Sequence, residues 1–330
     1  MNHSNIRALS ALIVIPLCLV SCSTNNGLRK FNDNDFNKEI PADVAQKFEV
    51  KDMSALAEVK EPVPPVETAK PKRKSKKIKK GKVMPEVKES VGPPMRRIDP
   101  MPFPEGEKLR YAIRYVGVTA ARLETEILPA KVVNDRKVYH LSGHATTMKF
   151  FELIYRVNDL LESFWDFDGL YSHRFTMDLD ESKQTRKLIE LYDYEKKKSF
   201  YWNRVDHKDK GFSEKKEEYD IQPWSQDPLS LLYYLRVVKL PQAPGETLKI
   251  PVILDGKGWD GVLTFDRKEK IFAGGRDFEA NVYKLDNYLN GELKNKDNTL
   301  WISNDEHRYV LRIEAKVKVG SFAIALDQVL

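Results

Sequence analysis

The sequence predicts a mostly β protein, built on a highly curved antiparallel sheet of half-barrel or barrel-like shape with one packed helix, plus a disordered N-terminal tail. Apolar and polar residues alternate with period two in several segments after residue 100. Turn dipeptides such as Asp168-Gly169 and Asn290-Gly291 separate these segments, as in an antiparallel meander. Residues 101–330 therefore form one β-rich domain, of a size that is normal for a barrel or sandwich.

Strand alternation puts apolar side chains on one face in the segments 107–115, 247–254 and 309–317. We expect this face to be the concave one. A concave sheet of this size encloses either a ligand cavity or a packed core, and the residues leave that choice open. The candidate ligand-lining residues are Tyr111, Ile113, Ile250, Val252, Leu311 and Ile313.

One segment, SQDPLSLLYYLRVVKLP, has the pattern of an amphipathic helix over residues 227–238. Asp227 suits the N-cap and Pro228 the first helical position. Leu231, Leu232, Leu235 and Val238 then form one apolar stripe, so this helix could fill the space that the sheet encloses. A second segment, TMKFFELIYRV at 147–157, is ambiguous between a short helix and a strand.

The N-terminus has the pattern of an export signal, with Arg7 followed by a short apolar run that is too short to span a bilayer. Leu19-Val20-Ser21-Cys22 resembles the lipobox of bacterial lipoproteins. The resemblance implies that residues 1–21 are removed and that Cys22 carries acyl chains such as palmitate, and Ser23 favours the outer membrane. The alternative is an ordinary signal peptide with an incidental cysteine.

Residues 22–100 are expected to be a lipid-anchored, disordered linker rich in Lys and Pro, because they contain almost no aromatic residues. Lys plus Arg exceed Asp plus Glu there, 19 against 12 within residues 1–100, which leaves a surplus of +7. The basic run is a solvated spacer or a contact for an anionic surface, either anionic lipid or peptidoglycan; the export signal argues against nucleic acid. Its basic residues are Lys70, Lys72, Arg73, Lys74, Lys76, Lys77, Lys79, Lys80 and Lys82.

No catalytic constellation is evident in the sequence. The motif GKGWDG at 256–261 precedes strand-like residues, whereas a dinucleotide fingerprint opens a helix. His140 and His144 would stand about 13 Å apart on a strand, beyond a common metal ion. The paired acids Asp166 with Asp168 and Asp178 with Asp180 are expected to be solvated, and we expect neither a metal nor a cofactor.

The segments PFPEGEKLRYAIRYVGVTAARLETEI, DLLESFWDFDGLYSHRF, WSQDPLSLLYYLRVVKLPQAPGETLKIPV and LWISNDEHRYVLRIEAKVKVGSFAIAL resemble the bacterial domain-of-unknown-function family numbered 3108. The resemblance implies an envelope protein on a highly curved antiparallel sheet, similar in style to the half-barrels that carry lipids and lipoproteins in the periplasm. It implies no settled activity.

Together these features predict an outer-membrane-anchored periplasmic lipoprotein that binds a lipid-like or other apolar envelope molecule in its concave sheet. The alternative is a structural or interaction lipoprotein, whose basic tail contacts the cell wall or anionic lipid while the domain docks a protein partner. An enzyme that acts on envelope polymers is the third possibility.

Overall fold

The structure is a computed structural model that describes residues 28–31, 40–58, 93–316 and 321–330. The expected signal peptide, Cys22 and the basic run at 70–82 lie outside these residues. The helices are α2 (Ala42–Lys47), α3 (Ala55–Glu58), α4 (Lys149–Glu152) and α5 (Pro228–Val237). The strands are β1 (Lys51–Asp52), β2 (Lys108–Tyr115), β3 (Val118–Val133), β4 (Arg136–Thr147), β5 (Val157–Asp166), β6 (Ser172–Glu181), β7 (Gln184–Asp193), β8 (Lys198–His207), β9 (Gly211–Asp220), β10 (Thr247–Ile253), β11 (Gly258–Ala273), β12 (Arg276–Leu289), β13 (Glu292–Ser303), β14 (Val310–Lys316) and β15 (Ser321–Val329).

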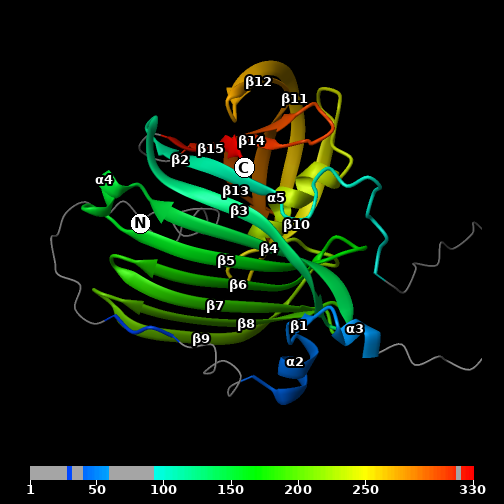
Figure 1. Cartoon of the computed structure of the whole chain (residues 1–330), viewed down its shortest axis with the longest axis vertical. Coiled ribbons are helices and arrows are strands. Elements are labelled where there is room, and N and C mark those ends of the chain that lie inside the picture. Colours follow the sequence, from blue (N-terminus) through cyan, green and yellow to red (C-terminus); the bar gives the residue numbers. More distant parts are fainter. Residues whose placement is uncertain (1–27, 32–39, 59–92, 317–320) are drawn as a thin grey trace, which may run out of the picture.

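All strands belong to one antiparallel sheet, whose order runs β10-β11-β12-β13-β14-β15-β2-β3-β4-β5-β6-β7-β8-β9, with β1 paired to β3. The sheet bends so strongly that β10–β13 stand across from β3–β9 (Figure 1). It does not close, because β9 and β10 are the two ends of the order. The prediction of a highly curved antiparallel sheet with a packed helix is confirmed.

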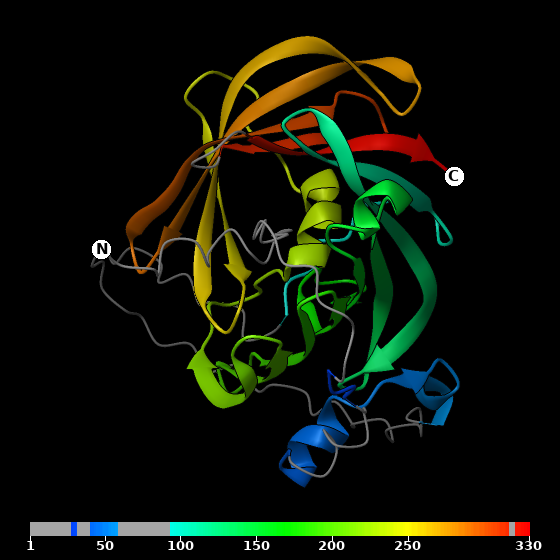
Figure 2. The ribbon, with the colours of Figure 1, turned by 90° about the vertical axis from the view of Figure 1, so that its left-hand side faces the viewer.

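Helix α5 lies inside the curve, between the two halves of the sheet (Figure 2). The Asp227 carboxylate caps it by accepting hydrogen bonds from the backbone N–H groups of Leu229 and Ser230, both at 2.8 Å. The same carboxylate accepts from the hydroxyls of Ser163 on β5 and Ser172 on β6, both at 2.5 Å. The N-cap that the sequence predicts therefore also fixes the helix to the sheet.

The other end of α5 is held by a buried ion pair. Arg236 donates two hydrogen bonds to the Glu107 carboxylate, at 2.5 and 3.0 Å, and a third to the Pro102 carbonyl. The guanidinium also lies over the rings of Phe103 and Tyr309. Because these partners come from the chain just before β2 and just before β14, they join α5 to the middle of the sheet.

Residues 40–58 differ from the expected disordered linker, because they fold against the outer face of the sheet. Ile40 and Phe48 are buried in a cluster with side chains of β3, β4, β5, β7 and β8, such as Trp202. The physical reason is local: Ile40, Val44 and Phe48 recur at a spacing of four, which gives α2 one apolar stripe. Composition averaged over residues 24–100 concealed this short pattern.

The strand ends form two rims. We name one the α4 rim: it carries α4, the β2–β3 turn, the β6–β7 turn and the β8–β9 turn. The opposite rim carries the β3–β4, β5–β6 and β7–β8 turns. None of the helices in the described part of the chain is long and apolar enough to cross a membrane.

Candidate functional site

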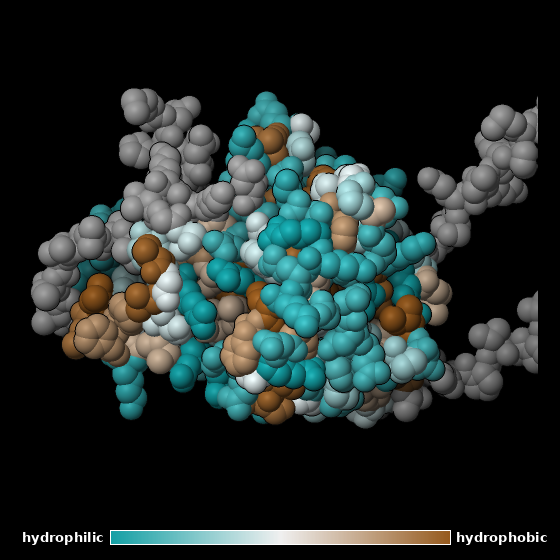
Figure 3. Space-filling model, turned by 90° about the horizontal axis from the view of Figure 1, so that it is seen from above, coloured by the Kyte–Doolittle hydropathy of each residue, from teal (hydrophilic) through white to brown (hydrophobic). Residues whose placement is uncertain are grey.

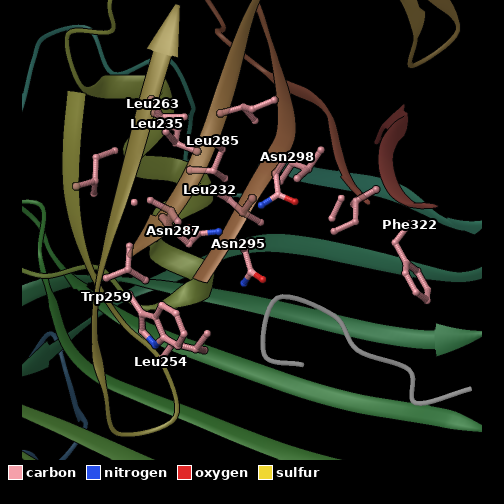
Figure 4. Close-up of a pocket in the computed structure, with 18 of the residues that line it drawn as sticks. Leu232, Leu235, Leu254, Trp259, Leu263, Leu285, Asn287, Asn295, Asn298 and Phe322 are labelled. Carbon is pink, nitrogen blue, oxygen red and sulfur yellow. The ribbon is translucent and has the colours of Figure 1, made fainter. Parts of the chain in front are cut away.

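An apolar pocket lies between α5 and the strands β10–β15 (Figure 4). Its cavity volume is about 110 Å³. Its lining residues come from the inner face of the sheet and from one side of the helix: Ile113, Leu231, Leu232, Leu235, Ile250, Val252, Leu254, Trp259, Gly261, Leu263, Leu285, Asn287, Asn295, Asn298, Leu300, Ile313, Ala315, Phe322 and Ile324. The sheet thus encloses both packed core and an unfilled space.

Four of the six candidate lining residues, Ile113, Ile250, Val252 and Ile313, line this pocket. They come from β2, β10 and β14, which are distant in sequence, and the curvature of the sheet brings them together. Leu231, Leu232 and Leu235 of the predicted helix stripe face them across the pocket. The helix therefore narrows the enclosed space without filling it.

Tyr111 and Leu311 do not line the pocket and instead belong to a buried cluster with Tyr309 and Leu326, which adjoins the pocket at Ile113. In β14 the pairing with β13 shifts between Trp301↔Arg312 and Ile302↔Val310, which leaves Leu311 as the extra residue of a bulge. A simple period of two puts Leu311 and Ile313 on one face, and the bulge breaks that period. Tyr111 lies on the same face of β2 as Ile113, two residues earlier in the strand. At that position core side chains fill the space.

Three asparagines give the pocket its polar groups, and the sequence-based prediction did not include them. Asn287 and Asn295 are paired across β12 and β13, and Asn298 follows on β13. Figure 4 shows their amides beside one another, with Trp259 and Leu254 at one end of the pocket and Phe322 at the other. The side chains of these asparagines make no hydrogen bond within the described part of the chain, so their amides can hydrogen-bond a ligand.

The chemistry of the lining favours an uncharged ligand. No lining residue is ionisable, and a charged group would lose hydration there without gaining a counter-ion. Aliphatic side chains provide most of the contact surface, while an amide can donate to an ester or amide carbonyl and accept from a hydroxyl. Trp259 Nε1 is also buried without a hydrogen-bond partner among the described residues.

Two groups of buried acids contribute no residue to the pocket lining. Asp159 and Glu181 are neighbours at the start of β5 and the end of β6, and burial raises the pKa of both carboxyls. Asp166 contacts Arg136 and His173; hydrogen bonds from both outweigh its burial and hold the pKa of this carboxyl far below its usual range. Neither site opens into the pocket, and each acid has a structural partner.

The histidines and the remaining acids singled out in the sequence are also in separate places. His140 contacts Glu162 and His144 contacts Asn158, each at 2.8 Å. Asp178 pairs with Lys187, and Asp180 pairs with Arg156. Within the described residues, no group of three or more His, Cys, Asp or Glu side chains could hold a metal ion.

The residues of GKGWDG form the turn after β10 and the start of β11, and strand β11 continues where a dinucleotide site needs a helix. Of this motif, Trp259 and Gly261 line the apolar pocket. A side chain at position 261 would meet the Ile250 carbonyl at 3.7 Å, an ordinary contact distance. Gly261 is therefore part of the apolar pocket wall.

Comparison with known proteins gives a family and no activity. A β-barrel-like protein of the domain of unknown function DUF1849 from Brucella abortus has 9% identity and a TM-score of 0.41, with 68% of this chain and 97% of that chain covered. A candidate exported protein with a YmcC-like fold from Bacteroides fragilis has 10% identity and a TM-score of 0.31, with 70% and 98% covered. A candidate lipoprotein from Parabacteroides distasonis has 9% identity, a TM-score of 0.31 and the same coverage.

No curated protein matches the sequence. The family model described as a protein of unknown function, DUF3108, matches residues 110–327, which is most of the β-rich domain and more than half of the chain. The chain therefore belongs to the DUF3108 family.

Proposed function

We propose that this protein binds an acyl chain of an uncharged lipid, or a similar apolar molecule, in the pocket between α5 and β10–β15. The observation that carries the proposal is the lining: aliphatic side chains surround a cavity of about 110 Å³, and three neighbouring amides provide the polar contacts. An apolar cavity of roughly 150 Å³ binds benzene. The cavity therefore suits one segment of an acyl chain, with an ester or amide group at Asn287, Asn295 and Asn298.

The sequence supports a location in the cell envelope. The lipobox that ends at Cys22 is the feature on which this part of the proposal rests. We propose that acylated Cys22 anchors the protein in the outer membrane and that the domain faces the periplasm. In that location acyl chains of phospholipids, lipoproteins and their breakdown products are the available apolar ligands.

The test is thermal unfolding of the mature chain with Cys22→Ser, with and without a monoacylglycerol below its micelle concentration. At a hundred times its Kd a ligand adds about 2.7 kcal/mol to the stability. For a domain of this size, that corresponds to a rise in Tm of about 5 to 10 °C. The corresponding free fatty acid, ionised at pH 8, should raise the Tm less, because the lining offers its carboxylate no counter-ion.

Ile313→Trp should abolish the rise, because the larger side chain fills the pocket. Ile271→Trp is the matched control, since Ile271 is also half-buried but lies outside the lining. If no acyl compound shifts the Tm of the parent chain, the pocket is not a lipid site. The interaction-protein alternative, with the basic run at 70–82 as a contact for anionic lipid or peptidoglycan, would then be the better account.

A further inference from the structure

Exposed apolar side chains gather on the α4 rim. Phe150, Leu153 and Ile154 at α4 are 76%, 89% and 68% exposed, and Val116 and Val118 at the β2–β3 turn are 60% and 56% exposed. The two groups are neighbours, because the Met148 N–H donates to the Ala120 carbonyl at 2.9 Å. Figure 3 shows brown and tan side chains at the left-hand end, where α4 lies in Figure 1. Side chains of this size are rarely left in water together without a function.

Basic side chains are exposed on the same elements that border this apolar group. Arg114, Arg122 and Lys149 are exposed on β2, β3 and α4, and none of them makes an ion pair with a described residue. The nearby exposed acid on α4 is Glu152. Apolar side chains flanked by unpaired basic ones match the boundary of an anionic bilayer, where acyl chains lie beneath phosphate groups.

The start of the described chain lies on the same rim. The Thr185 hydroxyl donates to the Arg29 carbonyl at 2.6 Å, and the Arg29 N–H donates to the Asp206 carboxylate at 3.0 Å. The ring of Phe31 contacts Phe212 at the start of β9. Figure 1 shows residues 28–31 in dark blue at the end of the sheet where α4 lies.

This position matters because Cys22, the expected site of acylation, is only six residues before Leu28. Six residues span at most about 20 Å. An acyl anchor on Cys22 would therefore hold the α4 rim, and not the opposite rim, next to the membrane.

The pocket also extends toward the α4 rim. Ala315 and Phe322, which line it, stand opposite one another at the end of β14 and the start of β15. The ring of Phe322 contacts Tyr115, the last residue of β2, at 4.8 Å between centroids. Val116 comes next in the chain, so the exposed apolar group begins where the pocket wall ends.

We propose that the α4 rim docks on the surface of a lipid bilayer, with Val116, Val118, Phe150, Leu153 and Ile154 inserted at the boundary between headgroups and acyl chains. The docked rim places the end of the pocket against the bilayer, so that an acyl chain can pass between the two without crossing water. That route rests on the proposed function, whereas the docking surface rests on the rim alone.

The experiment measures partition of the full mature chain with Cys22→Ser onto vesicles of phosphatidylethanolamine and phosphatidylglycerol, at high salt so that the basic run is screened. Each large apolar side chain that enters the lipid contributes about tenfold to the partition coefficient. Phe150→Ser with Leu153→Ser should therefore weaken partition by about a hundredfold. Phe272→Ser is the matched control and should change the partition little, because Phe272 is 72% exposed near the end of β11, far along that strand from its pocket-lining residues.

A second measurement uses the acylated protein, in which Cys22 offers no free thiol. Fluorophores attached at Leu153→Cys and at Phe272→Cys should be quenched by brominated lipid at position 153 only. Equal quenching at both positions, or equal partition of the rim variant and its control, would overturn the proposal. A contact with a protein partner would then explain the exposed apolar side chains of the rim. The rim variants should keep the Tm rise with monoacylglycerol. The docking proposal and the ligand-binding proposal can therefore be refuted independently of each other.

Discussion

Glu190 on β7 should make the stability of this domain fall as the pH rises. Its side chain points into the core between Leu188 and Tyr192 and is 1% exposed. Among the described residues, only the Ser199 hydroxyl, at 3.3 Å, and the Tyr192 hydroxyl, at 3.4 Å, donate to it. Burial raises the pKa of the Glu190 carboxyl from 4.5 to about 8. The folded state therefore binds a proton more tightly than the unfolded state does.

The sign follows from linkage. The stability that protonated Glu190 contributes is fully present below pH 4.5 and is lost as the pH rises through about 8. At 1.36 kcal/mol per pKa unit, the loss between pH 5 and pH 8 is about 3 kcal/mol. Glu190→Gln keeps the shape and the hydrogen bonds of the neutral acid but cannot ionise. We expect this variant to gain about 3 kcal/mol over the parent between pH 5 and pH 8.

Urea unfolding of the parent and of Glu190→Gln at both pH values measures this difference, since other titrating groups cancel between the two proteins. Glu218→Gln is the control, because Glu218 lies exposed on the edge strand β9. A difference between parent and Glu190→Gln that is the same at pH 5 and pH 8 would refute the argument. The carboxyl would then ionise in the folded state as easily as it does in the unfolded chain.

Three further changes test other parts of the structure. Arg236→Met should cost about 3 to 5 kcal/mol because it leaves Glu107 buried and unpaired, and adding Glu107→Gln should restore part of the loss in urea unfolding. Phe48→Ala should lower the free energy of unfolding by about 3 to 5 kcal/mol if residues 40–58 are part of the folded domain. A loss below about 1 kcal/mol would show that these residues belong to the linker instead. Cys22→Ser should move the protein out of the membrane fraction or stall its processing; unchanged fractionation with the outer membrane would refute the lipobox interpretation.

The fold was largely predictable because its signals are local and repeated. Alternation identified the strands 108–115, 247–253 and 310–316 to within a residue or so at each end. Asp227, Pro228 and the leucine stripe identified α5, because a cap and a 3.6-residue period are both visible in one short segment. The ambiguous segment 147–157 resolves into α4 and the start of β5.

The pocket was predictable only in part, because it depends on long-range geometry. Ile113, Ile250, Val252 and Ile313 were found from alternation alone. Leu311 was misplaced because a bulge depends on the pairing of two strands and leaves no mark in a single one. The asparagines escaped notice because polar residues near an Asn-Gly turn usually face water, and here the curvature of the sheet turns Asn298 inward, where it is 5% exposed.

Docking of residues 40–58 also changes what the basic run can reach. Lys51 and Asp52 pair with β3 near the β3–β4 turn, and the N–H groups of Arg96 and Arg97 donate to the Asp168 carbonyl in the β5–β6 turn. Both contacts lie on the opposite rim, so the described segments before and after residues 59–92 are both attached to the domain at that rim.

Between two attachment points on one rim, 34 residues of chain can extend outward and back by no more than roughly 60 Å. With the α4 rim on the bilayer, as proposed, both attachment points lie on the side of the domain that faces away from the membrane. A ten-residue strand such as β5 spans roughly 33 Å from rim to rim, so both anionic surfaces proposed for the nine cations, lipid and peptidoglycan, stay within that reach.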